Sequence, residues 1–269
     1  MGKLLSAWLD LRAIDELSRR QTLIHRVHPS AKALVAAAFI LTATSFDKYE
    51  IAGLFPLFFY PVMLIALAEL PYKTLLKRLL LMSPFALFIG LANPIFDRTP
   101  QWAFGPLFVT GGWLSLASIL LKFALTTLAA LLLIATTTLS DLGAALHRLG
   151  LPRPLVVQLL FLYRYLSVLL TEAGRMTQAC ELRAAPGSGL PYRTWGSLLG
   201  QLLLRTIDRA ERIYAAMRCR GFTGEIKLLR QQSFQKKDAY YLLLWLTFFL
   251  SCRLINLPHA LGKLLLEVL

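Results

Sequence analysis

Two arginines in this 269-residue chain stand where long helical patterns end. Arg183 precedes Ala184 and the helix breaker Pro186-Gly187. Arg220 directly precedes Gly221, another residue typical of a helix end. An arginine side chain presents a planar fork of donors that binds carboxylates bidentately, and it stays charged at every physiological pH. The two matching positions therefore favour a device that grips two similar acidic partners.

The candidate docking residues are these arginines and their immediate neighbours. An arginine at a helix C-terminus also meets the negative end of the helix dipole, so a purely stabilising cap is the alternative for either one alone. Two related tips, each followed by a small residue that permits close backbone approach, favour docking instead. The docking set is Leu182, Arg183, Ala184, Met217, Cys219, Arg220 and Gly221.

The sequence lacks several common motifs of enzymes and of metal sites. There is no G-x-x-x-x-G-K-[ST] phosphate loop, no H-E-x-x-H zinc motif and no G-x-S-x-G nucleophile motif. The three cysteines show no C-x-x-C spacing, which argues against a zinc site or a disulfide framework. His25 and His28 leave two interpretations open, a shared metal or, as we favour, surface or capping side chains. We therefore assign no catalytic residue, no metal site and no cofactor.

Two long helices must position the arginines. Leucines recur at helical spacing from Leu155 to Arg183, and a second amphipathic pattern runs from about Trp195 to Arg220. The connector 185–191 is rich in Pro and Gly and breaks the helix. At 1.5 Å per residue each helix reaches about 40 Å, so the pair forms a lever with an arginine at the end of each arm. We interpret 155–170 as amphipathic rather than as a span, although this stretch could dip into a bilayer.

The composition identifies the surroundings of this lever as a membrane. The chain is 57% hydrophobic and 16% charged, with a mean hydropathy of +0.58, which exceeds the needs of a soluble core. Its formal charge of +14 concentrates beside apolar runs, since residues 140–238 hold 15 basic and 7 acidic side chains. An excess of Lys and Arg next to spans marks the cytoplasmic side of a membrane protein. We therefore expect the lipid bilayer, and no nucleic acid, to be the counterpart of this charge.

Five apolar runs are long enough, or nearly so, to cross a bilayer, and we place them at about 33–46, 51–68, 75–95, 113–139 and 240–257. Asn93-Pro94 ends the third span, and a nearly uncharged outer loop follows at 96–112. Lys122 in the fourth span is either a functional intramembrane charge or, as we favour, a side chain that snorkels to the interface.

The predicted fold is therefore an all-α integral membrane protein. It has about five transmembrane helices plus two long amphipathic cytoplasmic helices, with the N-terminus inside. Its predicted domains are 1–139 with the first four spans, 140–238 with the two arginine tips, and 239–269 with the last span.

Several short segments carry a resemblance to a known family. They are His25 to Lys32, Asn93-Pro94, Thr137 to Leu142 with Leu149 to Pro152, Tyr163 to Leu166, and the arginine signatures Leu182-Arg183-Ala184 and Cys219-Arg220-Gly221. The second signature is a close match, and the first departs from the family pattern with Ala184 in place of Gly. With these segments the chain resembles the transmembrane T component of energy-coupling factor (ECF) transporters, specifically the cobalt-transport Q subunit.

The resemblance implies partners and roles for the site residues. The arginine tips would dock into acidic-lined grooves on two ATP-binding cassette ATPase subunits. The amphipathic arms would cradle a substrate-binding membrane subunit of the cobalt or nickel type, with Tyr163, Arg164 and Tyr165 in the coupling to it. The chain itself would be a non-catalytic subunit of an importer for cobalt, or else nickel, in the bacterial or archaeal cytoplasmic membrane.

Two other functions compete with this interpretation. An intramembrane enzyme acting on anionic lipids would use the basic block to hold phosphate, but it needs convergent carboxylates or a nucleophile near the interface, and we find none. A secondary transporter needs inverted repeats and polar residues at mid-membrane depth, whereas these spans are few and apolar.

Overall fold

The computed structural model describes residues 18, 20, 22–48, 50–96, 100–104, 107–183, 192–224 and 234–254. Contacts group the chain into two compact units. For the chain from Leu17 onward, we call the first the membrane unit, with Leu17–Thr138 and Gln232–Leu269, and the second the arm unit, with Leu139–Gln231. Three predicted features lie outside the described residues, namely Ala184, the connector 185–191 and the last span beyond Leu254.

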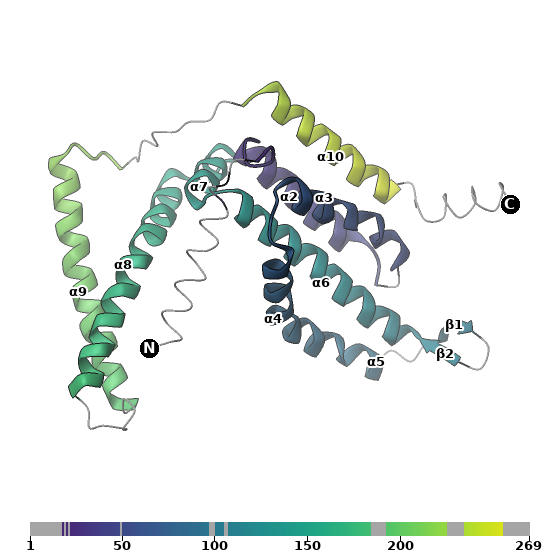
Figure 1. The fold of residues 1–269 in the computed structure, drawn as a ribbon, viewed down its shortest axis with the longest axis horizontal. Coiled ribbons are helices and arrows are strands. Elements are labelled where there is room, and N and C mark those ends of the chain that lie inside the picture. Colours follow the sequence, from purple (N-terminus) through teal and green to yellow (C-terminus); the bar gives the residue numbers. More distant parts are fainter. Residues whose placement is uncertain are drawn as a thin grey trace. The chain divides into compact units, whose positions relative to one another are not determined.

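The elements of both units are helices, with one small hairpin in addition (Figure 1). The membrane unit contains α2 (Pro29–Ser45), η1 (Ala52–Leu54), η2 (Pro56–Phe58), α3 (Phe59–Leu67), α4 (Tyr72–Gly90), α5 (Ala92–Phe96), β1 (Pro100–Phe104), β2 (Leu107–Thr110), α6 (Gly111–Thr136) and α10 (Lys236–Leu254). The arm unit contains α7 (Leu139–Arg148), α8 (Arg153–Arg183) and α9 (Tyr192–Cys219). The predicted all-α class is confirmed. Strands β1 and β2 pair antiparallel within the expected outer loop.

The helices have the lengths and compositions of a multi-pass membrane protein. Three stretches of the described chain are long and apolar enough to cross a bilayer, Tyr72–Pro94, Gly111–Thr136 and Arg153–Arg183, and two shorter apolar helices cover Pro29–Ser45 and Ala52–Leu67. Helix α8 thus qualifies by composition, so its interpretation as an amphipathic arm stays a prediction.

Two predicted spans differ in detail because of their prolines. The second begins as the 3₁₀ turns η1 and η2, and its α-helix starts only at Phe59, after Pro56. The third apolar span ends at Pro94, as Asn93-Pro94 predicted, but its helix is interrupted at Leu91, and both residues lie in the short helix α5. Pro94 has no N–H with which to continue the helical bonding to Gly90, and this accounts for the break between α4 and α5.

Aromatic side chains form the centre of the membrane unit. Phe39 of α2 packs against Tyr60 of α3 and Phe249 of α10, with ring centroids 4.6 and 5.3 Å apart. Trp245 closes the cluster, 4.7 Å from Tyr60 and 5.8 Å from Phe249. All four side chains are buried. Since lipid is as apolar as these rings, close packing rather than water exclusion stabilises this contact between helices.

Helices α2 and α6 cap each other with lysines. Lys32 of α2 donates from Nζ to the main-chain oxygen of Thr136, the last residue of α6, at 2.8 Å. Lys122 of α6 donates to the main-chain oxygens of Phe46 and Asp47, at the end of α2. The last carbonyls of a helix lack partners within the helix and carry its negative dipole, so each ammonium group satisfies them.

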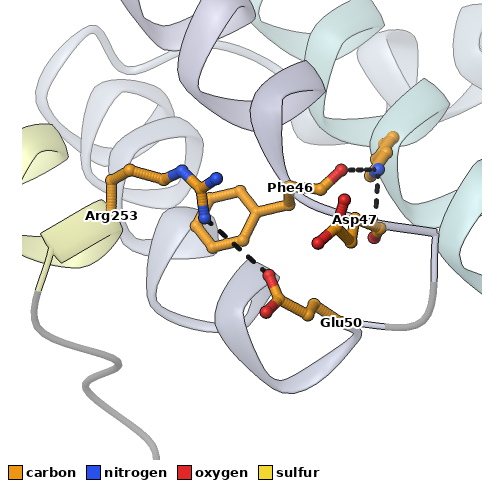
Figure 2. A network of polar contacts seen from close by, with 5 residues as sticks. Phe46, Asp47, Glu50 and Arg253 are labelled. Carbon is orange, nitrogen blue, oxygen red and sulfur yellow. Dashed lines mark hydrogen bonds and ion pairs between the residues drawn. The ribbon is translucent and has the colours of Figure 1, made fainter.

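These caps mark the two ends of the membrane unit. We call the end with residues 28–32, 136–138 and 234–238 the junction end, and the end with Phe46, Glu50, Lys122 and Arg253 the far end. At the far end Arg253 of α10 lies over the Phe46 ring, 5.1 Å from its centroid, and 3.8 Å from Glu50 Oε2 (Figure 2). Lys122 thus caps a neighbouring helix, and the snorkelling that we favoured for it stays a prediction.

The histidines have local structural roles. His28 is the N-cap of α2, and its Nδ1 accepts a hydrogen bond from the Ser30 N–H. His25 Nδ1 lies 2.8 Å from the Thr22 hydroxyl. Within the described part of the chain, no three His, Cys, Asp or Glu side chains gather as metal ligands. The capping role that we favoured for this pair is thus observed for His28.

Candidate functional site

Helices α8 and α9 cross as an antiparallel pair. Phe161, near the start of α8, contacts Phe222, which follows the end of α9, with ring centroids 6.4 Å apart. Further along, Arg205 of α9 donates to Glu172 of α8 at 2.6 Å. As residue numbers increase along α8, the numbers of their partners on the α9 side decrease, so the two helices run antiparallel. The C-terminal ends of the two helices, each with its predicted arginine, therefore lie at opposite ends of the pair.

The tip after α9 is a glycine-closed turn. The Phe222 N–H donates to the Met217 oxygen and the Gly221 N–H donates to the Arg218 oxygen, both at 3.0 Å. This pair of bonds is the usual way to satisfy the last carbonyls of a helix, and it needs a left-handed residue. Gly221 supplies it, with φ of +78°. Arg220 is exposed on this turn.

Phe222 fixes the turn to the other helix. A side chain two positions after the last helical turn often packs back onto its own helix or a neighbour. Here the Phe222 ring packs against Phe161 of α8. The backbone that carries Arg220 is thus tied both to α9, through hydrogen bonds, and to α8, through an aromatic contact.

The tip of α8 ends in an exposed pair. Arg183 is the last residue of the helix and is exposed, and the Leu182 side chain beside it is 81% exposed. From Phe161, which lies beside the α9 tip, to Arg183 the helix rises about 33 Å. Two guanidinium groups so far apart cannot bind one small ligand, but they can reach two separate macromolecular sites.

A cavity of about 500 Å³ lies between the two arms. Apolar and aromatic side chains of both helices make up most of its wall, and Arg209 and Thr206 are the polar members. The lining residues are Phe161, Tyr165, Val168, Leu169, Thr206, Ile207, Arg209, Ala210, Ile213, Tyr214 and Met217. Met217, one of the predicted docking residues, thus lines this cavity.

The three predicted coupling residues lie on different faces of α8. Tyr165 lines the cavity, whereas Tyr163 and Arg164 do not. Successive residues of an α-helix point about 100° apart, so Tyr163 and Tyr165 face nearly opposite directions. Tyr163 is half-buried and Arg164 is exposed.

Sequence reasoning missed the contact between Phe161 and Phe222, and of the cavity wall it singled out only Tyr165 and Met217 as site residues. Only part of this site had a local signal, namely a hydrophobic residue directly after Arg220-Gly221, which is the usual companion of a glycine helix end. Phe161 lies among many apolar residues of α8, and nothing in its own neighbourhood marks it. The pairing across the two helices depends on their crossing point, which the sequence pattern leaves undefined.

Comparison with known proteins matches the chain to a described family. The model of the cobalt transport protein family, CbiQ, matches residues 20–231. The nickel permease LarQ of Lactiplantibacillus plantarum is 38% identical over 89 residues, which are 33% of this chain and 33% of that protein. The cobalt transport protein CbiQ of Rhodobacter capsulatus is 32% identical over 95 residues, 35% of this chain and 39% of that protein.

A longer match has lower identity. An uncharacterized protein of Methanocaldococcus jannaschii is 26% identical over 249 residues, covering 86% of this chain and 87% of its own length. The matches to the two named relatives are partial, since they cover 33% of LarQ and 39% of CbiQ.

Proposed function

Because the chain belongs to the CbiQ family of cobalt transport proteins, we propose that it is the transmembrane coupling subunit of an energy-coupling factor importer. In this role it takes up mechanical work from two ATP-binding cassette ATPase subunits. It passes that work to a separate membrane subunit that binds the substrate. The chain itself catalyses no reaction.

The observation that carries this proposal is the placement of the two arginines. Arg183 and Arg220 are both exposed, and they stand at opposite ends of the antiparallel arms. Each can enter an acidic groove on one of two ATPase subunits and bind a carboxylate bidentately. The separation of about 33 Å along α8 suits two similar proteins bound side by side better than one.

The mechanism follows from this arrangement. When the ATPase subunits bind and hydrolyse ATP, the distance between their grooves changes, and the arginine tips follow. The α8–α9 pair then changes its crossing, as packed helices do in hinge and shear motions. The membrane partner, held against the arms, changes its access to the two sides of the membrane.

The membrane partner is proposed to contact the arms through apolar side chains. Tyr165 lies in the wall of the cavity between α8 and α9, and Tyr163 and Arg164 extend the surface on other faces of α8. The names of two relatives support cobalt or nickel as the substrate of the complex. In this assignment the N-terminus and the arms lie on the cytoplasmic side of a bacterial or archaeal membrane.

The test is affinity purification of the tagged chain from native membranes in mild detergent. The expected companions of the wild-type chain are a P-loop ATPase and a small membrane protein. Arg183→Glu and Arg220→Glu should each lower the recovered ATPase at least about tenfold, because loss of one partner of a buried charge pair costs about 2–5 kcal/mol.

Two arginines of the same helices provide matched controls. Arg175 and Arg212 are exposed and lie eight positions before the two docking arginines. Arg175→Glu and Arg212→Glu make the same charge change away from the tips and should leave ATPase recovery unchanged. Equal losses in all four variants would contradict docking at the tips, and wild-type chain recovered alone would contradict the coupling role itself.

A further inference from the structure

From Leu17 onward the chain passes between its two units twice, and residues next to both passages bond to the same turn of the membrane unit. The crossings lie between Thr138 and Leu139 and between Gln231 and Gln232. Thr136, just before the first crossing, and Asp238, just after the second, both bond to the first turn of α2, residues 28–32.

At the first crossing the bond is a buried lysine on a helix end. Lys32 Nζ donates to the Thr136 oxygen at 2.8 Å, two residues before the chain leaves the membrane unit. Lys32 is 4% exposed and Thr136 is 5% exposed. A charged donor on the dipole end of a helix, away from water, makes a strong and short hydrogen bond.

At the second crossing the bond is a buried carboxylate. Asp238, 5% exposed, lies in the first turn of α10, soon after the chain returns. Its Oδ1 accepts from the His28 N–H and its Oδ2 from the Gln235 N–H, both at 2.8 Å. The Phe234 ring packs edge-on against the His28 ring, with centroids 5.5 Å apart.

We infer that the first turn of α2, from His28 to Lys32, is the anchor through which motion of the arm unit reaches the membrane unit. A displacement at either crossing pulls on this turn through short, buried, charge-assisted bonds. Helix α2 then carries the displacement into the aromatic core through Phe39, which contacts α3 and α10. Lys32 and Asp238 are positioning residues, and this role rests on the coupling function proposed above.

A merely structural role would give the same contacts, so a matched control is needed. Lys122 provides it, because it joins the same two helices by the same kind of bond at the far end. Lys32→Met and Lys122→Met each remove one lysine cap. Only Lys32→Met removes a cap beside a crossing.

The first measurement uses the complex of the full chain with its co-purifying subunits in proteoliposomes. It determines the ATP hydrolysed per ⁵⁷Co²⁺ ion taken up. We expect Lys32→Met and Asp238→Asn to raise this ratio at least about fivefold, a typical scale for loss of coupling between sites. Lys122→Met should leave the ratio within about twofold of wild type. Equal ratios for the Lys32→Met and Lys122→Met variants would overturn the anchor.

The second measurement needs no partner and keeps the anchor testable if the wild-type complex shows no ATP-driven uptake. Spin labels at Tyr72→Cys in the membrane unit and Leu149→Cys in the arm unit report the distance between the units. Both positions are exposed, and the three native cysteines are replaced first. Lys32→Met and Asp238→Asn should broaden the distance distribution of the full chain in nanodiscs, and Lys122→Met should not. Distributions of equal width in all variants would overturn the inference, whatever the fate of the transport assay.

Discussion

The ammonium group of Lys32 lies 2.8 Å from the main-chain oxygen of Thr136, the residue at which α6 ends. At the other end of the same helix pair, Lys122 of α6 binds the carbonyl of Phe46, the C-cap of α2. An unsatisfied carbonyl is costly wherever water cannot reach it, as in the hydrocarbon region of a bilayer. Two antiparallel helices thus supply each other's missing partner with one lysine each.

The reciprocal caps predict a stability effect of similar size at both ends. Lys32→Met and Lys122→Met should each lower the free energy of unfolding by about 2 kcal/mol, the scale of a hydrogen bond to a charged group. Unfolding of the purified chain in mixed detergent micelles measures this. Lys77→Met, at an exposed lysine of α4, is the control and should have no effect. Unchanged stability of both cap variants would show that detergent or water replaces the lysines.

The tip after α9 predicts opposite effects for the same substitution at two glycines. Gly221→Ala should strain the turn by about 1–2 kcal/mol, because φ there is +78° and side chains disfavour that region. A Cβ at Gly221 meets no atom within 4 Å, so strain is the sole penalty. Gly200→Ala, in the middle of α9 with equal room, should stabilise the helix by about 1 kcal/mol.

The readouts for the glycine pair are ATPase recovery and amide hydrogen exchange at Phe222. Gly221→Ala should lower the ATPase recovery. It should also speed the amide exchange of Phe222, because the bond from the Phe222 N–H to the Met217 oxygen closes the strained turn. Gly200→Ala should change neither the ATPase recovery nor the exchange rate of Phe222. If Gly221→Ala leaves both readouts at wild-type values, the geometry of the Arg220 turn is irrelevant to docking.

We expect the ion pair between Arg205 and Glu172 to orient α8 and α9 relative to each other and to contribute little to stability. Arg205 and Glu172 side chains are 58% and 23% exposed, so solvent screens the pair and its contribution is about 0.5 kcal/mol. Glu172→Gln should hardly change stability. Glu172→Arg should instead place two like charges together and push the arms apart at the crossing.

The reversed pair tests this orientation. The double variant Glu172→Arg with Arg205→Glu should restore the hydrogen-exchange protection of α8 and α9 that Glu172→Arg loses. The loss should also shrink as salt is raised, since salt screens exposed charges. A loss that persists in the double variant would mean that packing of Glu172, and not its charge, holds the crossing.

Local sequence patterns were enough to predict the class of the molecule and the ends of its arms. Apolar runs and the basic block identified a membrane protein, and the Pro and Gly signals predicted where α8 and α9 stop. Arg183 and the Arg220-Gly221 turn lie where these local signals placed them. Such features are readable because helix ends depend on a few neighbouring residues and on their backbone preferences. The docking of these arginines stays a prediction.

The groups that the buried charges bind, in contrast, depend on how the helices pack together. Lys32 finds a partner 104 positions away, and Asp238 binds the N–H of His28 across 210 positions. The partner in each case is a backbone group, and every residue except proline carries the same N–H and C=O. A sequence pattern therefore cannot predict which backbone group such a charge will bind. It becomes defined only when packing of α2 against α6 and α10 fixes which helix end each charge meets.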